Sequence, residues 1–331
     1  MDWFERLTGF KETDPFTVRQ NMAMEGERLV SRANGSNWGA GRLETSMLRE
    51  LRTRRVVRSG STTFCLAQGD VGAAHADPAN AGAFFQVASQ FNALEMVSPS
   101  ITPEQGVTRY ERDHTQGPGC AMAAGAATIY RNYFVPLEGG VGQSGARQID
   151  GSADLRACLS AALGIPPQEL WEMENGYLLI GRGALDKVSS HIASASEAER
   201  DALRGTLAVT LHYDVEVTQV GAGRGQRVSQ AFCSALPIAY NDHPVEAWEP
   251  FARLVLEAAY EATLRAAATQ GNGCVFLTSL GGGAFGNPKP WIYDAIDRAL
   301  NLCAYDGLDV RHLSFSAPDE ALVALANKRQ R

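Results

Sequence analysis

The residues best suited to bind an anion are the glycines of segment 281–288, GGGAFGNP, which directly follows the apolar run 274–280, CVFLTSL. Three successive glycines permit backbone conformations closed to other residues and let a ligand approach the main chain closely. Asn287 is suited to cap a following helix and Pro288 to occupy its first turn, so exposed N–H groups and the helix dipole favour an anion there. The spacing matches neither a Walker A loop nor the usual dinucleotide fingerprint. A tight structural turn is the alternative.

A second group of candidate residues lies where the apolar run 84–89, FFQVAS, gives way to polar side chains. The amide of Asn92 is suited to bind a sugar hydroxyl and Phe91 to stack on a base, although Asn92 in an ordinary turn explains the pattern equally well. A polar loop follows at 102–120, of a length that often carries function in a compact domain. Its candidates, each with a solvated loop residue as the alternative, are Glu104, Glu111, Asp113, His114 and Gln116.

Strands and helices that alternate from residue 61 onward must position these groups. Runs of β-branched and apolar residues bounded by turn signals predict strands, and these lie at 61–66, 84–89, 177–180, 207–217, within 228–239, at 274–280 and at 310–314. Helical periodicity and capping signals predict helices, and these lie at 117–134, 154–163, 197–203, 246–269 and 289–303. The pattern favours a mostly parallel sheet covered on both faces. The strands near 207–239 have no long helix between them and predict some antiparallel pairing.

The first sixty residues differ from the rest, being polar and helix-leaning, with a glycine-rich break at 34–41 and a basic helix expected at 44–55. We therefore expect an N-terminal helical extension at 1–60 and one α/β domain at 61–331.

Composition narrows the function classes. The 331 residues are 45% hydrophobic and carry a net charge of −7, which argues against a general nucleic-acid or anionic-membrane binder. The start has no secretory signal pattern, and no run approaches the length of a membrane helix. The six cysteines are scattered, without ligand spacing to histidine, so no metal site is expected and the protein is expected in the cytoplasm.

The segment CVFLTSLGGGAFGNP, followed by a helix, resembles the last phosphate-binding loop of macrodomains, and most of all that of the microbial type of poly(ADP-ribose) glycohydrolase. The order of elements over 61–316 is also similar. The resemblance implies a three-layer α/β/α fold with a mixed sheet that binds ADP-ribose. It implies that Asn92 lies near the distal ribose. It also implies that the diphosphate and nearby ribose are wrapped by Gly281, Gly282, Gly283, Ala284, Phe285, Gly286 and Asn287.

The chain departs from that family in the loop that carries its catalytic acid. No triple glycine lies between Asn92 and Pro118, and no Gln-Glu-Glu is present. The acid is therefore assigned by position only, to Glu95, Glu111 or Asp113. Gly282 stands where the family often has cysteine, a small change that leaves the phosphate interpretation intact.

Three functions follow as hypotheses. The first is a hydrolase that removes ADP-ribose from a modified substrate, with no cofactor, a carboxylate from 95–113 as acid or base, and Gln116 among the ligand-binding residues. The second is a non-catalytic module that binds ADP-ribose or another nucleotide. The third is a cysteine hydrolase, because Cys120 lies in the first turn of a predicted helix, where the dipole lowers a thiol pKa. Its base would be His114, His212 or His243.

Overall fold

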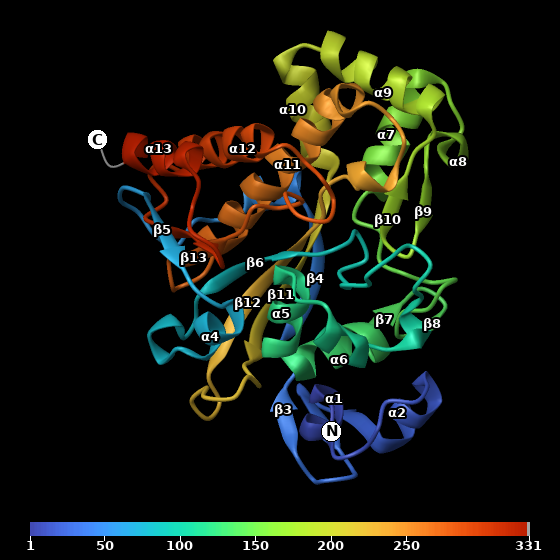
Figure 1. Cartoon of the computed structure of the whole chain (residues 1–331), viewed down its shortest axis with the longest axis vertical. Coiled ribbons are helices and arrows are strands. Elements are labelled where there is room, and N and C mark those ends of the chain that lie inside the picture. The colour runs from blue at the N-terminus through green and yellow to red at the C-terminus, as the bar shows by residue number, and fades with distance from the viewer. Residues whose placement is uncertain (330–331) are drawn as a thin grey trace.

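The computed structural model describes residues 1–329, and a seven-stranded mixed sheet is the centre of that part of the chain (Figure 1). In spatial order its strands are β4 (Arg42–Met47), β11 (Ala208–Glu216), β12 (Arg227–Cys233), β6 (Phe84–Ala88), β13 (Cys274–Leu277), β14 (Asp309–Ser314) and β5 (Thr63–Gln68). The pairs β4–β11 and β11–β12 are antiparallel, and the pairs from β12 through β5 are parallel. The predicted mixed sheet, with antiparallel pairing near 207–239, is confirmed.

The central strands are apolar because both faces of the sheet are covered. Strand β6 is buried along almost its whole length, and β13 beside it is similar. The edge strand β4 is more exposed, with one fully buried residue, Ser46. In β11 the pairing with β12 shifts between His212 and Val215, and the intervening Asp214 has a positive φ of 54°, which marks a β-bulge.

Helices form the two outer layers and complete the predicted three-layer α/β/α arrangement (Figure 1). One face carries α4 (Val71–Ala76), α5 (Gln116–Ala123) and α6 (Gly125–Tyr133). The other carries α3 (Leu48–Thr53), α7 (Ala153–Leu163), α9 (Arg182–Ser194), α10 (Glu197–Thr206), α11 (Val245–Ala268) and α12 (Lys289–Leu302), with α13 (Glu320–Arg329) beside α12 and β5. The helix predicted at 117–134 is two helices, because Ala124 leaves the helical conformation.

The N-terminal region is not the purely helical extension that we expected. It has the helices α1 (Trp3–Thr8) and α2 (Pro15–Asn21) and an antiparallel sheet of β1 (Met22–Glu25), β2 (Arg28–Ser31) and β3 (Asn37–Gly39). The expected basic helix is the strand β4 followed by the short α3, because residues 42–47 pair with β11. The division of the chain at residue 60 into two domains stays a prediction.

Smaller elements lie around the ends of the central strands. Two hairpins are formed by β7 (Pro136–Leu137) with β8 (Gly140–Val141) and by β9 (Glu172–Glu174) with β10 (Tyr177–Leu179). The short helices are α8 (Pro167–Leu170), η1 (Pro78–Asn80), η2 (Pro103–Gln105), η3 (Thr108–Arg112) and η4 (Ile238–Tyr240). Within residues 1–329, no helix is both long enough and apolar enough to cross a membrane.

Candidate functional site

Two adjoining cavities lie where the parallel strands β6, β13, β14 and β5 end, which is where open α/β sheets bind ligands. We call them the Glu95 cavity, of about 580 Å³, and the Asp70 cavity, of about 690 Å³. Segment 113–116, Thr278, Ser279 and Gly283 line both cavities. The two cavities therefore meet along the glycine loop on one side and the start of α5 on the other.

The glycine loop takes a fixed shape because of its own backbone contacts. Gly281 has a positive φ of 71°, and a Cβ there would lie 2.4 Å from the Cβ of Ala235, so only glycine fits. Asn287 does not cap α12 as predicted: Pro288 is the N-cap residue. Instead the Asn287 side chain donates to the carbonyl oxygens of Leu236 and Gly281, and its N–H donates to the Gly281 oxygen at 2.9 Å. Asn287 thus closes the loop upon itself.

The loop has hydrogen-bond donors without partners beside the Glu95 cavity. The N–H groups of Gly282, Gly286 and Asn287 bond within the loop. In contrast, the N–H groups of Gly281, Gly283, Ala284 and Phe285 donate to no acceptor in the described part of the chain, and all four residues line the Glu95 cavity. Unpaired N–H groups beside a helix start form an anion-binding site.

Glu95 brings a buried carboxyl group to the cavity named after it. The residue is only 3% exposed, and neither carboxylate oxygen has a hydrogen-bond partner within residues 1–329. Its N–H donates to the Tyr110 hydroxyl at 3.0 Å. Burial raises the pKa of Glu95 to about 7, while the charge of Arg131, 3.8 Å away, opposes the rise. A carboxyl group with this pKa can give or take a proton near neutral pH.

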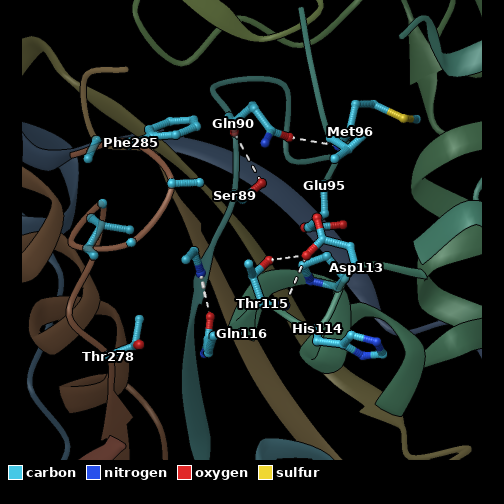
Figure 2. A pocket seen from close by; sticks show the side chains of 18 of the residues that line it. Ser89, Gln90, Glu95, Met96, Asp113, His114, Thr115, Gln116, Thr278 and Phe285 are labelled. Carbon is cyan, nitrogen blue, oxygen red and sulfur yellow. Dashed lines mark hydrogen bonds between the residues drawn. The ribbon is translucent and has the colours of Figure 1, made fainter. Parts of the chain in front are cut away.

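Asp113 is a second carboxylate of the same cavity. Figure 2 shows Glu95, Asp113 and His114 on one side of the cavity, with Phe285 and Thr278 across from them. The Asp113 side chain accepts bonds from the N–H and hydroxyl of Thr115 at 2.9 and 2.7 Å. Thr115 occupies the N-cap position of α5 but makes no side-chain cap. These bonds hold Asp113 at the cavity.

Gln116 lines both cavities, but its side-chain amide stabilises the fold by bonding the backbone of β6. The side chain accepts from the Ala88 N–H and donates to the Gln86 oxygen, both at 2.8 Å, so it ties the start of α5 to β6. Gly117 makes the same junction possible, because a Cβ there would lie 1.9 Å from the Ala88 oxygen. The close approach of α5 to β6 places 113–116 against the glycine loop.

Several predicted site residues lie away from both cavities. Glu111 pairs with Arg6 at 2.8 Å and accepts from the Trp3 N–H, so it holds α1. Phe91 is buried in the main core, and the Asn92 amide bonds Gln148 and the Leu94 N–H. Residues that do not line either cavity despite the prediction are Phe91, Asn92, Glu104, Glu111, Gly286 and Asn287.

The cysteine-hydrolase hypothesis is wrong. Cys120 is fully buried, and burial, reinforced by the charge of Glu95, raises its pKa well above the ordinary value. Its sulfur accepts a bond from the Gln116 amide at 3.1 Å. Such a thiol cannot ionise readily, whatever the helix dipole adds. His212 is buried beside Arg131, and His243 bonds the Ile180 oxygen away from Cys120.

The sequence did not predict two of three residues in an aromatic wall, nor a buried cation. Tyr177, Tyr240 and Phe285 pack with ring centroids 5.2–5.7 Å apart along the Glu95 cavity. Tyr177 and Tyr240 come from β10 and η4, distant in sequence from the polar loop, and carried no local signal. Arg131 follows the apolar run at 121–130 and is fully buried. A lone arginine after so apolar a run was the one available clue. Within residues 1–329, no cluster of histidine, cysteine and carboxylates could hold a metal ion.

Comparisons with known proteins find similarity among solved structures only. No protein-family model and no curated protein matches the chain. The poly(ADP-ribose) glycohydrolase from Thermomonospora curvata is 14% identical, with a TM-score of 0.45 over 95% of this chain and 96% of that one. The enzyme from Deinococcus radiodurans, in complex with ADP-ribose, is 13% identical, with a TM-score of 0.45 over 87% and 94%. The Thermomonospora enzyme bound to the inhibitor ADP-HPD is 15% identical, with a TM-score of 0.42 over 95% and 96%.

Proposed function

We propose that the protein binds ADP-ribose with the diphosphate on the glycine loop. The observation that carries this proposal is the set of four unpaired N–H groups, at Gly281 and 283–285, along the Glu95 cavity, with Gly283 at its junction with the Asp70 cavity. A diphosphate that links two ribosyl groups needs donors at its centre and room at each end. The two cavities, of about 580 and 690 Å³, supply that room.

We further propose that the protein is a hydrolase that releases ADP-ribose from a modified substrate. In this proposal the reacting ribose occupies the Glu95 cavity, because Glu95 lines it. Protonated Glu95 would donate to the leaving oxygen as the bond from that oxygen to ribose C1″ breaks. Water would then bond to C1″ and give its proton to a carboxylate, for which Asp113 lies on the same side. The products are ADP-ribose and the alcohol of the released group.

The buried carboxyl group favours catalysis over binding alone. A module that only binds ADP-ribose needs the glycine loop but gains nothing from an unpaired carboxylate that is 3% exposed. An isolated buried carboxyl group costs stability and is typical of active sites.

Calorimetric titration with ADP-ribose tests the binding step, with AMP and ribose 5-phosphate as controls. A Cβ at Gly283 would enter open space, so Gly283→Val should fold normally and fill the junction of the cavities. We expect this variant to lose ADP-ribose binding at least tenfold, on the order of 1.4 kcal/mol. The matched control is Gly183→Val, an exposed site on α9 with equal space. Equal binding by Gly283→Val and wild type would contradict the proposed site.

Release of ADP-ribose from poly(ADP-ribose) and from a mono-ADP-ribosylated peptide tests catalysis. Glu95→Gln should retain binding and lower kcat by about a hundredfold or more, the usual contribution of a general acid or base. Binding without turnover by the wild-type protein, on both probes, would leave the binding module as the function.

The location and partners are part of this proposal. All six cysteines are free thiols, which suits a reducing compartment, so we place the protein in the cytoplasm. Its partners would be ADP-ribosylated macromolecules. The formal charge of −7 does not favour nucleic acid at large.

A further inference from the structure

Arg131 is a fully buried cation held by fixed partners next to the candidate site. Its Nε donates to the Ala93 oxygen at 3.1 Å, and its Nη2 donates to the Thr128 hydroxyl at 3.1 Å. The guanidinium carbon lies 3.8 Å from the ring centroid of Phe232, a cation–π contact. These contacts come from the β6–η2 loop, α6 and β12, so the guanidinium has little freedom to move.

The charge of Arg131 has one carboxylate within ion-pair distance in the described chain, that of Glu95, with Nη2 and Oε2 3.8 Å apart. This separation is too long for a hydrogen bond, and both Glu95 oxygens stay unpaired. The carboxylate therefore feels the cation without being neutralised by direct contact. Both oxygens are buried and accept no hydrogen bond within residues 1–329.

Arg131 also fixes the backbone that leads to Glu95. Ala93 has a positive φ of 58°, a conformation that non-glycine residues adopt at a cost of roughly 1–3 kcal/mol. Its N–H donates to the Gln90 oxygen at 3.0 Å, and its carbonyl oxygen accepts from Arg131. This strained turn lies two residues before Glu95 and sets the direction in which the carboxyl group enters the cavity.

We propose that Arg131 is a positioning residue for Glu95, holding the Ala93 turn that aims the carboxyl group and supplying the one cation within ion-pair distance of it in residues 1–329. The inference rests on the proposed function, in which Glu95 transfers the proton. Arg131 does not line the cavity and touches no substrate. Its two effects are separable, because one depends on hydrogen-bond geometry and the other on charge.

Arg112 also lines the Glu95 cavity, but no ion pair joins it to Glu95 within residues 1–329. Tyr110 from η3, Asp113 after η3 and Cys120 from α5 face the carboxyl group, and each is neutral or anionic. His212 from β11 meets Arg131 at 3.4 Å, and burial together with the Arg131 charge lowers the pKa of this histidine well below its ordinary value. The imidazole is therefore neutral and can accept a bond from the guanidinium.

Three variants separate charge from geometry. Arg131→Lys keeps the charge but loses the planar fork that reaches Ala93 and Thr128 together. Arg131→Gln loses the charge. Ala93→Gly keeps Arg131 and frees the strained turn. The readouts are the pKa of the Glu95 carboxyl group, from infrared difference spectra referenced to Glu95→Gln, and kcat against pH for release of ADP-ribose from poly(ADP-ribose).

We expect Arg131→Gln to raise the pKa of Glu95 by about one unit, a tenfold change in proton affinity. The limb of the pH–rate profile set by Glu95 should move to higher pH by the same amount. Arg131→Lys and Ala93→Gly should leave that pKa unchanged and lower kcat by about tenfold or more, with KM little altered. If Arg131→Gln does not give folded protein, the other two variants carry the test.

The matched control is Arg204→Gln, another buried arginine, which pairs with Glu257 and Glu197 away from both cavities. It should lower stability without moving the pKa of Glu95 or the pH–rate profile. The inference is overturned if the pKa of Glu95 is unchanged in Arg131→Gln. It is also overturned if kcat of Arg131→Lys and of Ala93→Gly equals that of wild type. Absence of turnover by wild type would overturn the proposed hydrolase. The infrared titration would then still decide whether Arg131 controls the carboxyl group.

Discussion

The raised pKa of Glu95 suits proton transfer but lowers the stability of the folded protein at neutral pH. Its pKa is raised to about 7 in the folded protein, mainly by burial, against an ordinary value of 4.5. The folded state therefore holds a proton that the unfolded chain releases between those pH values. Folding stability must fall as the pH rises through this window and stay reduced above it. Such a residue destabilises the protein at neutral pH, as functional groups often do.

We predict that Glu95→Gln, which stays neutral at every pH, is more stable than wild type at pH 8. The gain should be on the order of 3 kcal/mol, the equivalent of the pKa rise, and should shrink toward zero below about pH 5. Urea unfolding at pH 5 and pH 8 measures the difference. Glu174→Gln, at an exposed glutamate of the β9–β10 hairpin, should change stability little at either pH. Equal stability of Glu95→Gln and wild type at pH 8 would show that the carboxyl group is not held at a raised pKa.

The site depends on how closely two elements approach the sheet end. The start of α5 packs on the last residues of β6, and the glycine loop after β13 packs on the segment after β12. At Gly281 both the positive φ and the 2.4 Å approach to the Ala235 Cβ exclude a side chain. At Gly283, in the same loop, neither restriction applies. Gly281 therefore shapes the loop, whereas Gly283 leaves open space at the cavities.

Gly281→Ala should lower the free energy of unfolding by about 1–3 kcal/mol, the usual cost of strained backbone. Gly283→Ala should be close to neutral for folding. Urea titration of both variants at one pH gives the comparison. Similar stability of the two would contradict the view that Gly281 shapes the loop.

An ion-pair network ties distant parts of the chain together on the face opposite α5. Arg52 of α3 and Arg298 of α12 both pair with Asp201 of α10 and Glu261 of α11, at 2.7–3.0 Å. Glu261 is 1% exposed. Burial favours its neutral form, but the two guanidinium groups overcome this and hold its pKa below the ordinary value. The N-terminal region is thereby fastened to the C-terminal helices.

Glu261→Gln should therefore destabilise the whole molecule by about 3 kcal/mol near pH 7, because a buried pair loses one charge. A carboxyl group with a lowered pKa stabilises above its unfolded pKa, and the effect is lost as the pH falls through its folded pKa. The loss caused by Glu261→Gln should thus diminish toward pH 3, as thermal unfolding at pH 7, 4 and 3 can show. Asp294→Asn, at an exposed pair with Arg253, serves as the control and should cost about 0.5 kcal/mol or less. A pH-independent loss at Glu261 would contradict the ion-pair explanation.

Local patterns determined much of the fold and part of the site. Apolar runs and turn residues predicted β5, β6, β10–β14 and the helices α7 and α10–α12, because hydrophobic periodicity and capping act over a few residues. Three consecutive glycines after a buried strand predicted the anion loop, since their backbone freedom needs no tertiary context. Glu95 and Asp113 were named from the same polar segments that now line one cavity.

Only the tertiary structure separated the site residues from their neighbours. Glu95 and Glu111 were equal candidates for the acid by their positions in the sequence. In the structure Glu95 is buried and unpaired at a cavity, while Glu111 pairs with Arg6. Residues 44–47 were predicted to begin a helix, but pairing with β11 makes them part of a strand. Arg131 reaches Glu95 across 36 positions of chain, the difference between the two residue numbers. The physical reason is the same in each case: the pKa of a carboxyl group, the pairing of an edge strand and the partners of a buried cation depend on contacts between distant residues, which sequence spacing does not contain.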